Sequence, residues 1–141
     1  VYLHQNGFVG LDDKNRLFRI EINGTISYRT LPFETPYKID ARGKNIVLLT
    51  ENKLEINGRL HELDFGLYGD PLIHVVNNRT LISLHDQQEE KVYVFDRKGN
   101  LLPHFPIYGA GSVTINSDRK GNVYLATTSE ENNVVVYQIP Q

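Results

Sequence analysis

The sequence predicts an all-β fold in which short antiparallel strands form about four repeated sheets. Short apolar runs alternate with hairpin turns along the chain, such as Asn-Gly at 23–24 and 57–58 and Asp-Arg-Lys-Gly at 96–99. No segment combines a 3.6-residue apolar period with helix caps, so we expect essentially no helix. Landmark residues also recur at a nearly constant spacing, which is typical of a repeat protein.

The composition is that of one ordinary globular domain over residues 1–141. Apolar residues make up 40% of the chain and charged residues 23%, which excludes a disordered segment. The formal net charge of -2 does not favour nucleic acid or an anionic membrane as a partner. No apolar run approaches the roughly 20 residues that span a bilayer. The chain has no cysteine, which excludes disulfides, thiolate metal sites and a cysteine nucleophile.

The repeats are marked by recurring turn sequences. The tetrapeptide Glu-Ile-Asn-Gly ends at Gly24 and again at Gly58, an offset of 34 residues (58 minus 24), and Gly99 follows 41 residues later (99 minus 58). These landmarks predict repeats of roughly 35–41 residues, at 1–35, 36–70, 71–111 and 112–141. The chain begins at Val1 inside a predicted strand, so we expect it to be part of a larger protein.

Each repeat is expected to contain four short strands, except that the last is incomplete and has three. The first repeat has predicted strands at 1–5, 8–11, 16–22 and 25–31. The second has strands at 37–41, 45–50, 53–56 and 60–65. The third has strands at 72–76, 80–85, 91–96 and 101–105, and the last at 113–116, 122–127 and 133–139. Several of these strands are apolar on both faces, which indicates that each sheet is covered on two sides.

The stretch 91–109 shows the unit most clearly. Its first strand is apolar on both faces, and Asp96 and Gly99 suit the first and fourth positions of a type I turn with a bulge. Pro103 and Pro106 cannot donate to a β-ladder, so the strand at 101–105 is expected at the edge of its sheet. Four-stranded antiparallel units of this length, stacked face to face, are typical of the blades of a β-propeller.

The same stretch spells the pattern D..G..LP.FP..G, from Asp96 to Gly109. This pattern resembles the blades of FG-GAP/VCBS and PQQ-like propeller repeats, and the resemblance covers most of the chain at the level of repeats. The calcium loop DxDxDG of FG-GAP repeats is absent, so the resemblance does not imply calcium. The repeats also resemble exported propeller proteins of Bacteroidetes type, which implies an extracytoplasmic location, in the periplasm or at the cell surface.

The residues that could carry catalysis are scattered. The five histidines, which include His85, have no metal-ligand spacing, and a lone histidine in a strand is most often structural. No nucleophile, phosphate-loop or metalloprotease motif is present. Acidic doublets such as Glu89-Glu90 and Glu130-Glu131 lie in predicted loops, where neighbouring carboxylates point apart. We therefore expect no catalytic residues, no metal and no cofactor.

When the charged residues are placed on the predicted blade, the acidic and the basic residues fall in loops at opposite faces. The loops expected at one face carry acids and tyrosines, which form a candidate binding face: Tyr37, Tyr68, Asp70, Glu89, Glu90, Tyr108, Glu130 and Glu131. The turns expected at the other face are basic: Arg42, Lys44, Arg79, Arg97, Lys98, Arg119 and Lys120. Charged turns also serve solubility, and the tyrosines can equally pack between blades. The sharper hypothesis is an acidic binding face opposite a basic one.

We therefore expect a non-catalytic interaction or scaffolding module that binds a protein or peptide partner, with no nucleic acid and no membrane span. One alternative is a carbohydrate-binding propeller, because tyrosine suits sugar contacts. Another is a fragment of a propeller glycosidase or lyase, which requires two converging buried carboxylates. Open blade edges would allow self-association, and the sequence leaves a closed ring and an open arc as alternatives.

Overall fold

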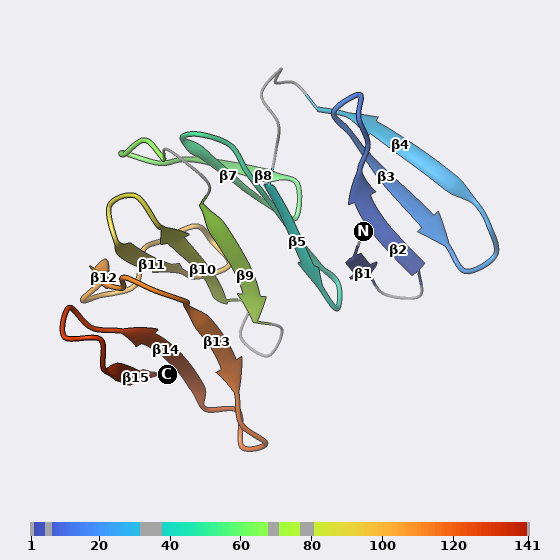
Figure 1. Ribbon diagram of the computed structural model, residues 1–141. Helices are drawn as coiled ribbons and strands as arrows, with labels where there is room; N and C mark the ends of the chain where they lie inside the picture. Colours follow the sequence, from blue (N-terminus) through green and yellow to red (C-terminus); the bar gives the residue numbers. More distant parts are fainter. Residues whose placement is uncertain (1, 5–6, 32–37, 68–70, 77–80, 141) are drawn as a thin grey trace. The chain divides into compact units, whose positions relative to one another are not determined.

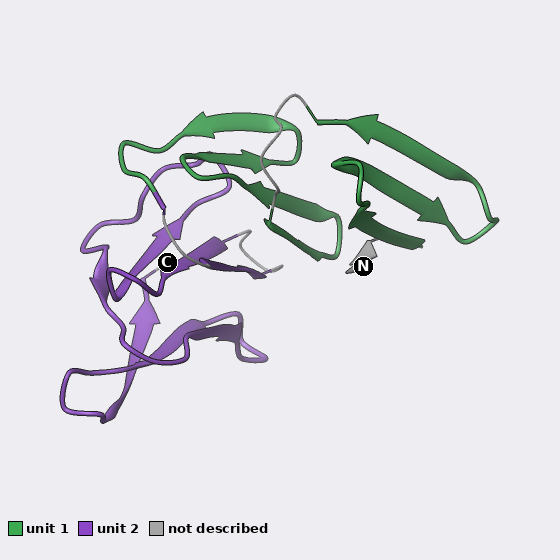
Figure 2. Ribbon diagram, turned by 45° about the horizontal axis from the view of Figure 1, so that its top comes forward, with its two compact units in different colours: residues 1–66 green, residues 67–141 purple. Residues whose placement is uncertain are grey.

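The computed structural model describes residues 2–4, 7–31, 38–67, 71–76 and 81–140 (Figure 1). These residues form antiparallel β-sheets and contain no helix, so the prediction of an all-β chain is confirmed. Accordingly, none of the described residues belongs to a helix that could cross a membrane. The chain divides into two compact units, residues 1–66 and 67–141 (Figure 2). Each unit contains two sheets.

Unit 1 consists of two four-stranded sheets in which neighbouring strands in the sequence are neighbours in the sheet. The first contains β1 (Tyr2–His4), β2 (Gly7–Leu11), β3 (Arg16–Glu21) and β4 (Ile26–Thr30). The second contains β5 (Lys38–Arg42), β6 (Asn45–Leu49), β7 (Lys53–Ile56) and β8 (Arg59–Glu62). This meander order follows from short turns, because only antiparallel strands can be joined by connections of a few residues.

The core of unit 1 lies between its two sheets. It is formed by buried apolar residues of both sheets: Val9, Leu17, Leu31, Ala41, Ile46 and Leu48. Side chains alternate along a strand, so Ile46 and Leu48 of β6 lie on the same face and both contribute to this layer. β6 is buried along its whole length, as its sequence Asn-Ile-Val-Leu-Leu predicts for a strand covered on both faces.

Unit 2 repeats this arrangement with one strand fewer among its described residues. Its first sheet contains β9 (Leu72–Val76), β10 (Leu81–Asp86), β11 (Lys91–Phe95) and β12 (Ile107–Tyr108). Its second contains β13 (Thr114–Ser117), β14 (Val123–Thr128) and β15 (Val134–Ile139). The last predicted repeat is therefore a three-stranded sheet in its described residues. The core between the two sheets is aliphatic: Val76, Leu81, Val92, Val94, Val113, Ile115, Val123, Leu125 and Ile139.

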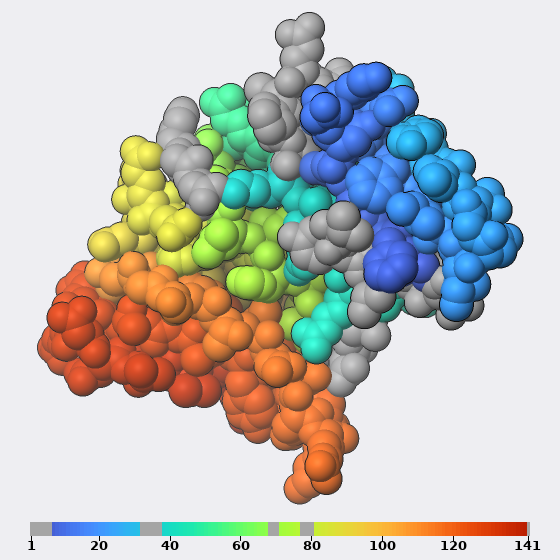
Figure 3. All heavy atoms as spheres, turned by 45° about the vertical axis from the view of Figure 1, so that its right-hand side comes forward, coloured from blue at the N-terminus to red at the C-terminus, as the bar shows by residue number. Residues whose placement is uncertain are grey.

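The turns at 96–99 and 118–121 have the predicted chemistry. Asp96 and Asp118 each accept backbone hydrogen bonds from the residues two and four positions later, at 2.8–3.0 Å. Gly99 and Gly121 have positive φ angles of 83° and 87°, a conformation that glycine adopts without steric cost. The second of these turns joins β13 to β14 and projects from the surface of unit 2 (orange in Figure 3).

The two copies of Glu-Ile-Asn-Gly form different turns. In the first, the Gly24 N–H donates to the Glu21 carbonyl at 2.9 Å, so Glu21 begins a four-residue turn and is exposed. In the second, Asn57 (φ 49°) and Gly58 (φ 85°) form a two-residue hairpin turn, and Glu55 lies inside β7 and is buried. The repeated tetrapeptide marks a hairpin twice, but its glutamates are not equivalent.

One strand lies elsewhere than predicted. In the stretch expected as a strand at 101–105, Leu101 forms only an isolated bridge to β11. Pro103 has no N–H to donate and His104 has a positive φ of 69°, so the chain leaves the sheet at this point. It returns as β12, after both prolines, and pairs with the beginning of β11. The edge position is as expected, but the strand is displaced toward the other end of the sheet.

Candidate functional site

Three of the predicted acidic and tyrosine residues line a groove of about 360 Å³ in unit 2. The groove runs from β12 to the turn between β14 and β15, and Tyr108, Glu130 and Glu131 line it. Thr127 and Tyr137 contribute from the two strands. Among the described residues that line this groove, none is cationic. Its size lies within the range typical of small-ligand sites.

The floor of the groove follows from strand register. Thr127 pairs with Val135 and Leu125 with Tyr137, so these side chains share the face of the sheet that carries the core of unit 2. Thr127 is only 3% exposed, and its Oγ1 has no hydrogen-bond partner among the described residues. A buried hydroxyl without a partner costs free energy, so this oxygen is available to a ligand that fills the groove.

Tyr108 connects the groove to the turn between β10 and β11. Its hydroxyl donates a hydrogen bond to Glu90 Oε2 at 3.1 Å. Burial raises the pKa of Tyr108, and the hydrogen bond to Glu90 and the negative charges of Glu90 and Glu130 raise that pKa further. Glu90 lies in the turn between β10 and β11 and Glu130 in the turn between β14 and β15, yet both act on one phenol. The groove therefore has a negative potential.

Side-chain oxygens fix the backbone of the two acidic turns. Asp86 Oδ1 accepts hydrogen bonds from the backbone N–H groups of Gln88 and Glu89, both at 3.1 Å. Ser129 Oγ accepts from the N–H groups of Glu131 and Asn133, both at 3.3 Å. Such Asx and Ser turns hold a short loop in one conformation. The carboxylates at the mouth of the groove are thus carried on defined turns.

The connection between the two sheets of unit 2 runs beside the groove. The Gly109 N–H donates to the Glu90 carbonyl at 2.9 Å, and the Gly111 N–H donates to Thr128 Oγ1 at 2.7 Å. A Cβ on Gly109 would lie 2.5 Å from Val92 Cγ2 and 2.7 Å from Thr127 Oγ1. Glycine is therefore required here for the close approach of the chain to Thr127.

Four of the eight predicted acidic-face residues come together in this way: Glu90, Tyr108, Glu130 and Glu131. Glu89 is exposed in the same turn as Glu90 and does not line the groove. Tyr37, Tyr68 and Asp70 lie outside the described residues. The binding role of the described ones stays a prediction.

The predicted basic residues that the structure describes lie in or beside turns. Arg97 and Lys98 are exposed in the turn that follows β11, and Arg119 and Lys120 in the turn between β13 and β14. Each of these turns is at the end of its strand opposite to the acidic turn, because successive turns of an antiparallel meander alternate between strand ends. In unit 1, Arg42 and Lys44 are exposed around the β5–β6 turn, and Arg79 lies outside the described residues.

His85 is buried beneath this region. One ring nitrogen, Nε2, lies 2.9 Å from the Gly109 carbonyl oxygen. Because a carbonyl only accepts, Nε2 is the donor of this hydrogen bond, and Nδ1 has no partner among the described residues. The histidine thus fixes Gly109 beside the groove. No group of acidic, histidine or cysteine residues in the described part of the chain could hold a metal ion.

Sequence reasoning missed Thr127, Ser129 and Tyr137. The candidate residues were chosen by their position in loops and by their charge. Thr127 and Tyr137 are uncharged and lie in strands, so neither criterion selects them. The strand Val-Val-Val-Tyr-Gln-Ile is apolar at several successive positions, so its sequence does not show that Tyr137 shares a face with Val135. The register between β14 and β15 is the information that was lacking.

The fold defines the chain as a β-propeller-type protein built from blade-like sheets. No family model matches the sequence, and no curated protein matches it. Among solved structures, the chain is similar to a streptogramin B lyase, with a TM-score of 0.51 and 16% identity, over 94% of this chain and 54% of that one. It is also similar to a catalytically inactive virginiamycin B lyase from Staphylococcus aureus with quinupristin, with a TM-score of 0.53 and 16% identity, over 94% of this chain and 55% of that one.

This likeness shows the fold alone. The chain spans about half the length of the two lyases, and at 16% identity nothing about their chemistry follows for its residues. The sequence-based expectation of propeller blades is thereby confirmed at the level of architecture.

Proposed function

We propose that this chain is a non-catalytic binding module and that the groove of unit 2 takes a lysine or arginine side chain of a protein or peptide partner. The observation that supports it is the lining of the groove. Two glutamates and two tyrosines surround a floor with an unpartnered threonine oxygen, and none of the described lining residues is cationic.

A cationic side chain matches each of these groups. Glu130 and Glu131 form no ion pair with any described residue, so their carboxylates are available as acceptors. Thr127 Oγ1 can accept an N–H hydrogen bond at the floor. The faces of Tyr108 and Tyr137 add cation–π attraction and contact for the aliphatic stem of a lysine. Charge-assisted hydrogen bonds of this kind are about twice as strong as neutral ones.

The described carboxylates do not favour catalysis. The two buried acids in the described part of the chain, Glu55 and Asp86, belong to different units. Glu55 pairs with Arg29, and Asp86 holds the backbone of a turn. Neither is poised as a member of an acid–base pair, so we propose binding without chemistry.

The test is the affinity for a lysine-rich peptide, measured by calorimetry at low salt. The variant Glu130→Gln/Glu131→Gln removes two charges from the groove and should weaken binding about tenfold, the loss of roughly 1.4 kcal/mol. The matched control Glu21→Gln/Glu62→Gln removes two exposed charges from unit 1 and should leave the affinity unchanged. Equal losses in both variants would mean that net charge, and not the groove, attracts the peptide.

A second candidate is a glycan, because Tyr108 and Tyr137 both line the groove. Tyrosine rings suit the apolar faces of sugars, and the carboxylates would accept hydroxyl hydrogen bonds. An uncharged oligosaccharide would bind with little salt dependence and would lose affinity on Tyr137→Ala. The cationic peptide would instead lose affinity steeply as salt rises.

We further propose that the blades are of the FG-GAP/VCBS or PQQ-like type, as the pattern from Asp96 to Gly109 suggests. The partner and extracytoplasmic location that go with such repeats are part of the same proposal. Self-association is a further expectation, supported by the exposed Val134 and Val136 on the edge strand β15.

A further inference from the structure

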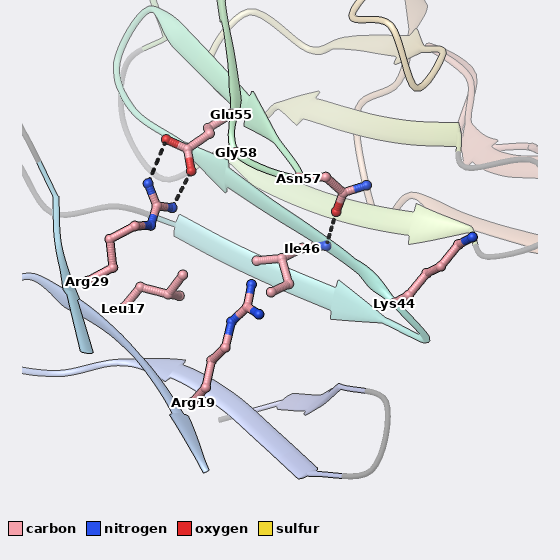
Figure 4. Close-up of a pocket in the computed structure, with 8 residues that line it drawn as sticks. All are labelled: Leu17, Arg19, Arg29, Lys44, Ile46, Glu55, Asn57 and Gly58. Atoms are coloured by element: carbon pink, nitrogen blue, oxygen red, sulfur yellow. Dashed lines mark hydrogen bonds and ion pairs between the residues drawn. The ribbon is translucent and has the colours of Figure 1, made fainter. Parts of the chain in front are cut away.

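Unit 1 contains a second cavity, of about 470 Å³, with the opposite electrostatic character (Figure 4). It lies between the two sheets of this unit, and Leu17 and Ile46 form an apolar part of its wall. Three cationic side chains line it: Arg19 from β3, Arg29 from β4, and Lys44 from the β5–β6 turn. Glu55 is its one acidic lining residue among those described.

Strand register explains why arginines line an intersheet cavity. Arg29 lies opposite Leu17, and Arg19 lies opposite Val9, so both arginines are on the face of their sheet that carries the core. Glu55 lies opposite Leu48 on the facing sheet. The charged groups therefore continue the two apolar layers that pack against each other.

Arg29 and Glu55 form an ion pair across the cavity (Figure 4). The Glu55 side chain is only 7% exposed, whereas that of Arg29 is 45% exposed. The guanidinium therefore compensates the buried carboxylate and still has an outer edge open to the cavity. This pair accounts for one positive charge of the lining.

Arg19 is different, because its side chain makes no hydrogen bond or ion pair with any described residue. Its guanidinium extends from β3 toward the wall at Ile46 (Figure 4). A guanidinium presents five N–H donors in a planar fork that fits a carboxylate or a phosphate bidentately. Here the fork faces a cavity large enough for a small organic molecule.

We propose that this cavity binds a small organic anion, whose carboxylate or phosphate group is held by the fork of Arg19. The apolar part of the ligand rests on Leu17 and Ile46, and the outer edge of Arg29 and the ammonium of Lys44 add attraction. Glu55 stays paired with Arg29 and orients it. Carboxylate and phosphate ligands share this chemistry, and the experiment separates them.

The experiment uses the whole chain labelled with ¹⁵N, and it follows the arginine Nε–H signals during titration with succinate and, separately, with inorganic phosphate. The Arg19 signal should shift and saturate with one of the two probes, and the Arg97 signal of the exposed turn should not. A saturating shift with succinate alone identifies a carboxylate site, and one with phosphate alone a phosphate site. If neither probe shifts Arg19 more than Arg97, the proposal is wrong.

Two variants complete the test. Arg19→Gln removes the guanidinium but keeps a polar side chain on this exposed strand position. It should reduce the affinity for the probe that saturates by about tenfold, as expected for the loss of a charge-assisted pair. Arg97→Gln removes the same charge from a turn of unit 2 and should leave the affinity for that probe unchanged. Identical affinities for Arg19→Gln and the unaltered chain would overturn the assignment to this cavity.

Discussion

At the scale of single residues, side-chain oxygens that accept backbone hydrogen bonds organise the turns of this chain. Asp12, Asp96 and Asp118 each receive N–H groups from residues two and four positions later. Asp12 also forms an ion pair with Arg16 at 2.7 Å. These three carboxylates are thus engaged by the turns themselves. Glu130 and Glu131 are not, which is why they are the better candidates for a partner.

The first residue-scale prediction concerns Asp118. The side-chain amide of Asn122 lowers the pKa of Asp118 below its usual value of 3.8; burial opposes this, and backbone N–H groups lower the pKa further. A lowered folded-state pKa contributes stability that is present above pH 3.8 and is lost as the pH falls through the folded-state pKa. The variant Asp118→Asn keeps an oxygen acceptor but loses the charge. It should be less stable than the unaltered chain at neutral pH, and this difference should vanish in acid.

Urea unfolding at several pH values measures this difference. The variant Asn122→Ala removes the amide donor and serves as a second, independent change at the same turn. It should also reduce the stability at neutral pH more than in acid. A stability difference for Asp118→Asn that is the same at all pH values would show that the charge of Asp118 contributes nothing.

At the scale of strands and sheets, the ion pair between Arg29 and Glu55 joins the two sheets of unit 1. Removing Arg29 alone leaves a buried carboxylate without its partner. We expect Arg29→Leu to destabilise the chain by about 2 kcal/mol. This is less than the loss expected on breaking a fully buried ion pair, because the arginine is half exposed. The double variant Arg29→Leu/Glu55→Leu replaces the pair by apolar contacts with Leu17 and Leu48, and should recover most of this loss.

A double-mutant cycle in urea unfolding provides the measurement. A strong coupling free energy is expected, because each partner compensates the other in a partly buried site. Additive losses, with the double variant the least stable of all, would contradict this role of the pair.

The sequence predicted where strands and turns lie better than it predicted on which face of a strand each side chain lies. Turn chemistry located the hairpins at Gly99 and Gly121, because an aspartate first and a glycine fourth leave few alternatives. It could not distinguish the two Glu-Ile-Asn-Gly turns, since the difference between Glu21 and Glu55 depends on which residues of the hairpin pair across the strands. A shift of one residue moves every side chain of a strand to the other face.

The candidate site was predictable in part for the same reason. Glu90, Tyr108, Glu130 and Glu131 were chosen by loop position, and the structure brings them together in one region of unit 2. Tyr137 and Arg19 lie in strands, where burial and register decide what a side chain faces. The sequence predicted the edge strand at 101–105, whereas it lies at Ile107–Tyr108. Prolines end a strand, but they do not show where the chain re-enters the sheet.

At the scale of the whole chain, the near-zero net charge conceals two sites of opposite sign. Unit 2 carries a groove with two glutamates in its lining, and unit 1 carries a cavity with three cationic side chains and one glutamate in its lining. Each site lies at the junction of two sheets within its own unit. Junctions of this kind recur in any stack of blades, so substitutions at a few strand ends can change what is bound and leave the fold intact.

The central claim is that the groove of unit 2 is the binding site of a cationic partner. Backbone NMR of the whole chain during titration with a lysine-rich peptide tests it most directly, because each residue reports on its own surroundings. The account predicts the largest shifts at 127–131, Tyr108 and Tyr137, with none of comparable size in unit 1. Largest shifts at the basic turns 97–98 and 119–120, or shifts spread evenly over both units, would contradict it.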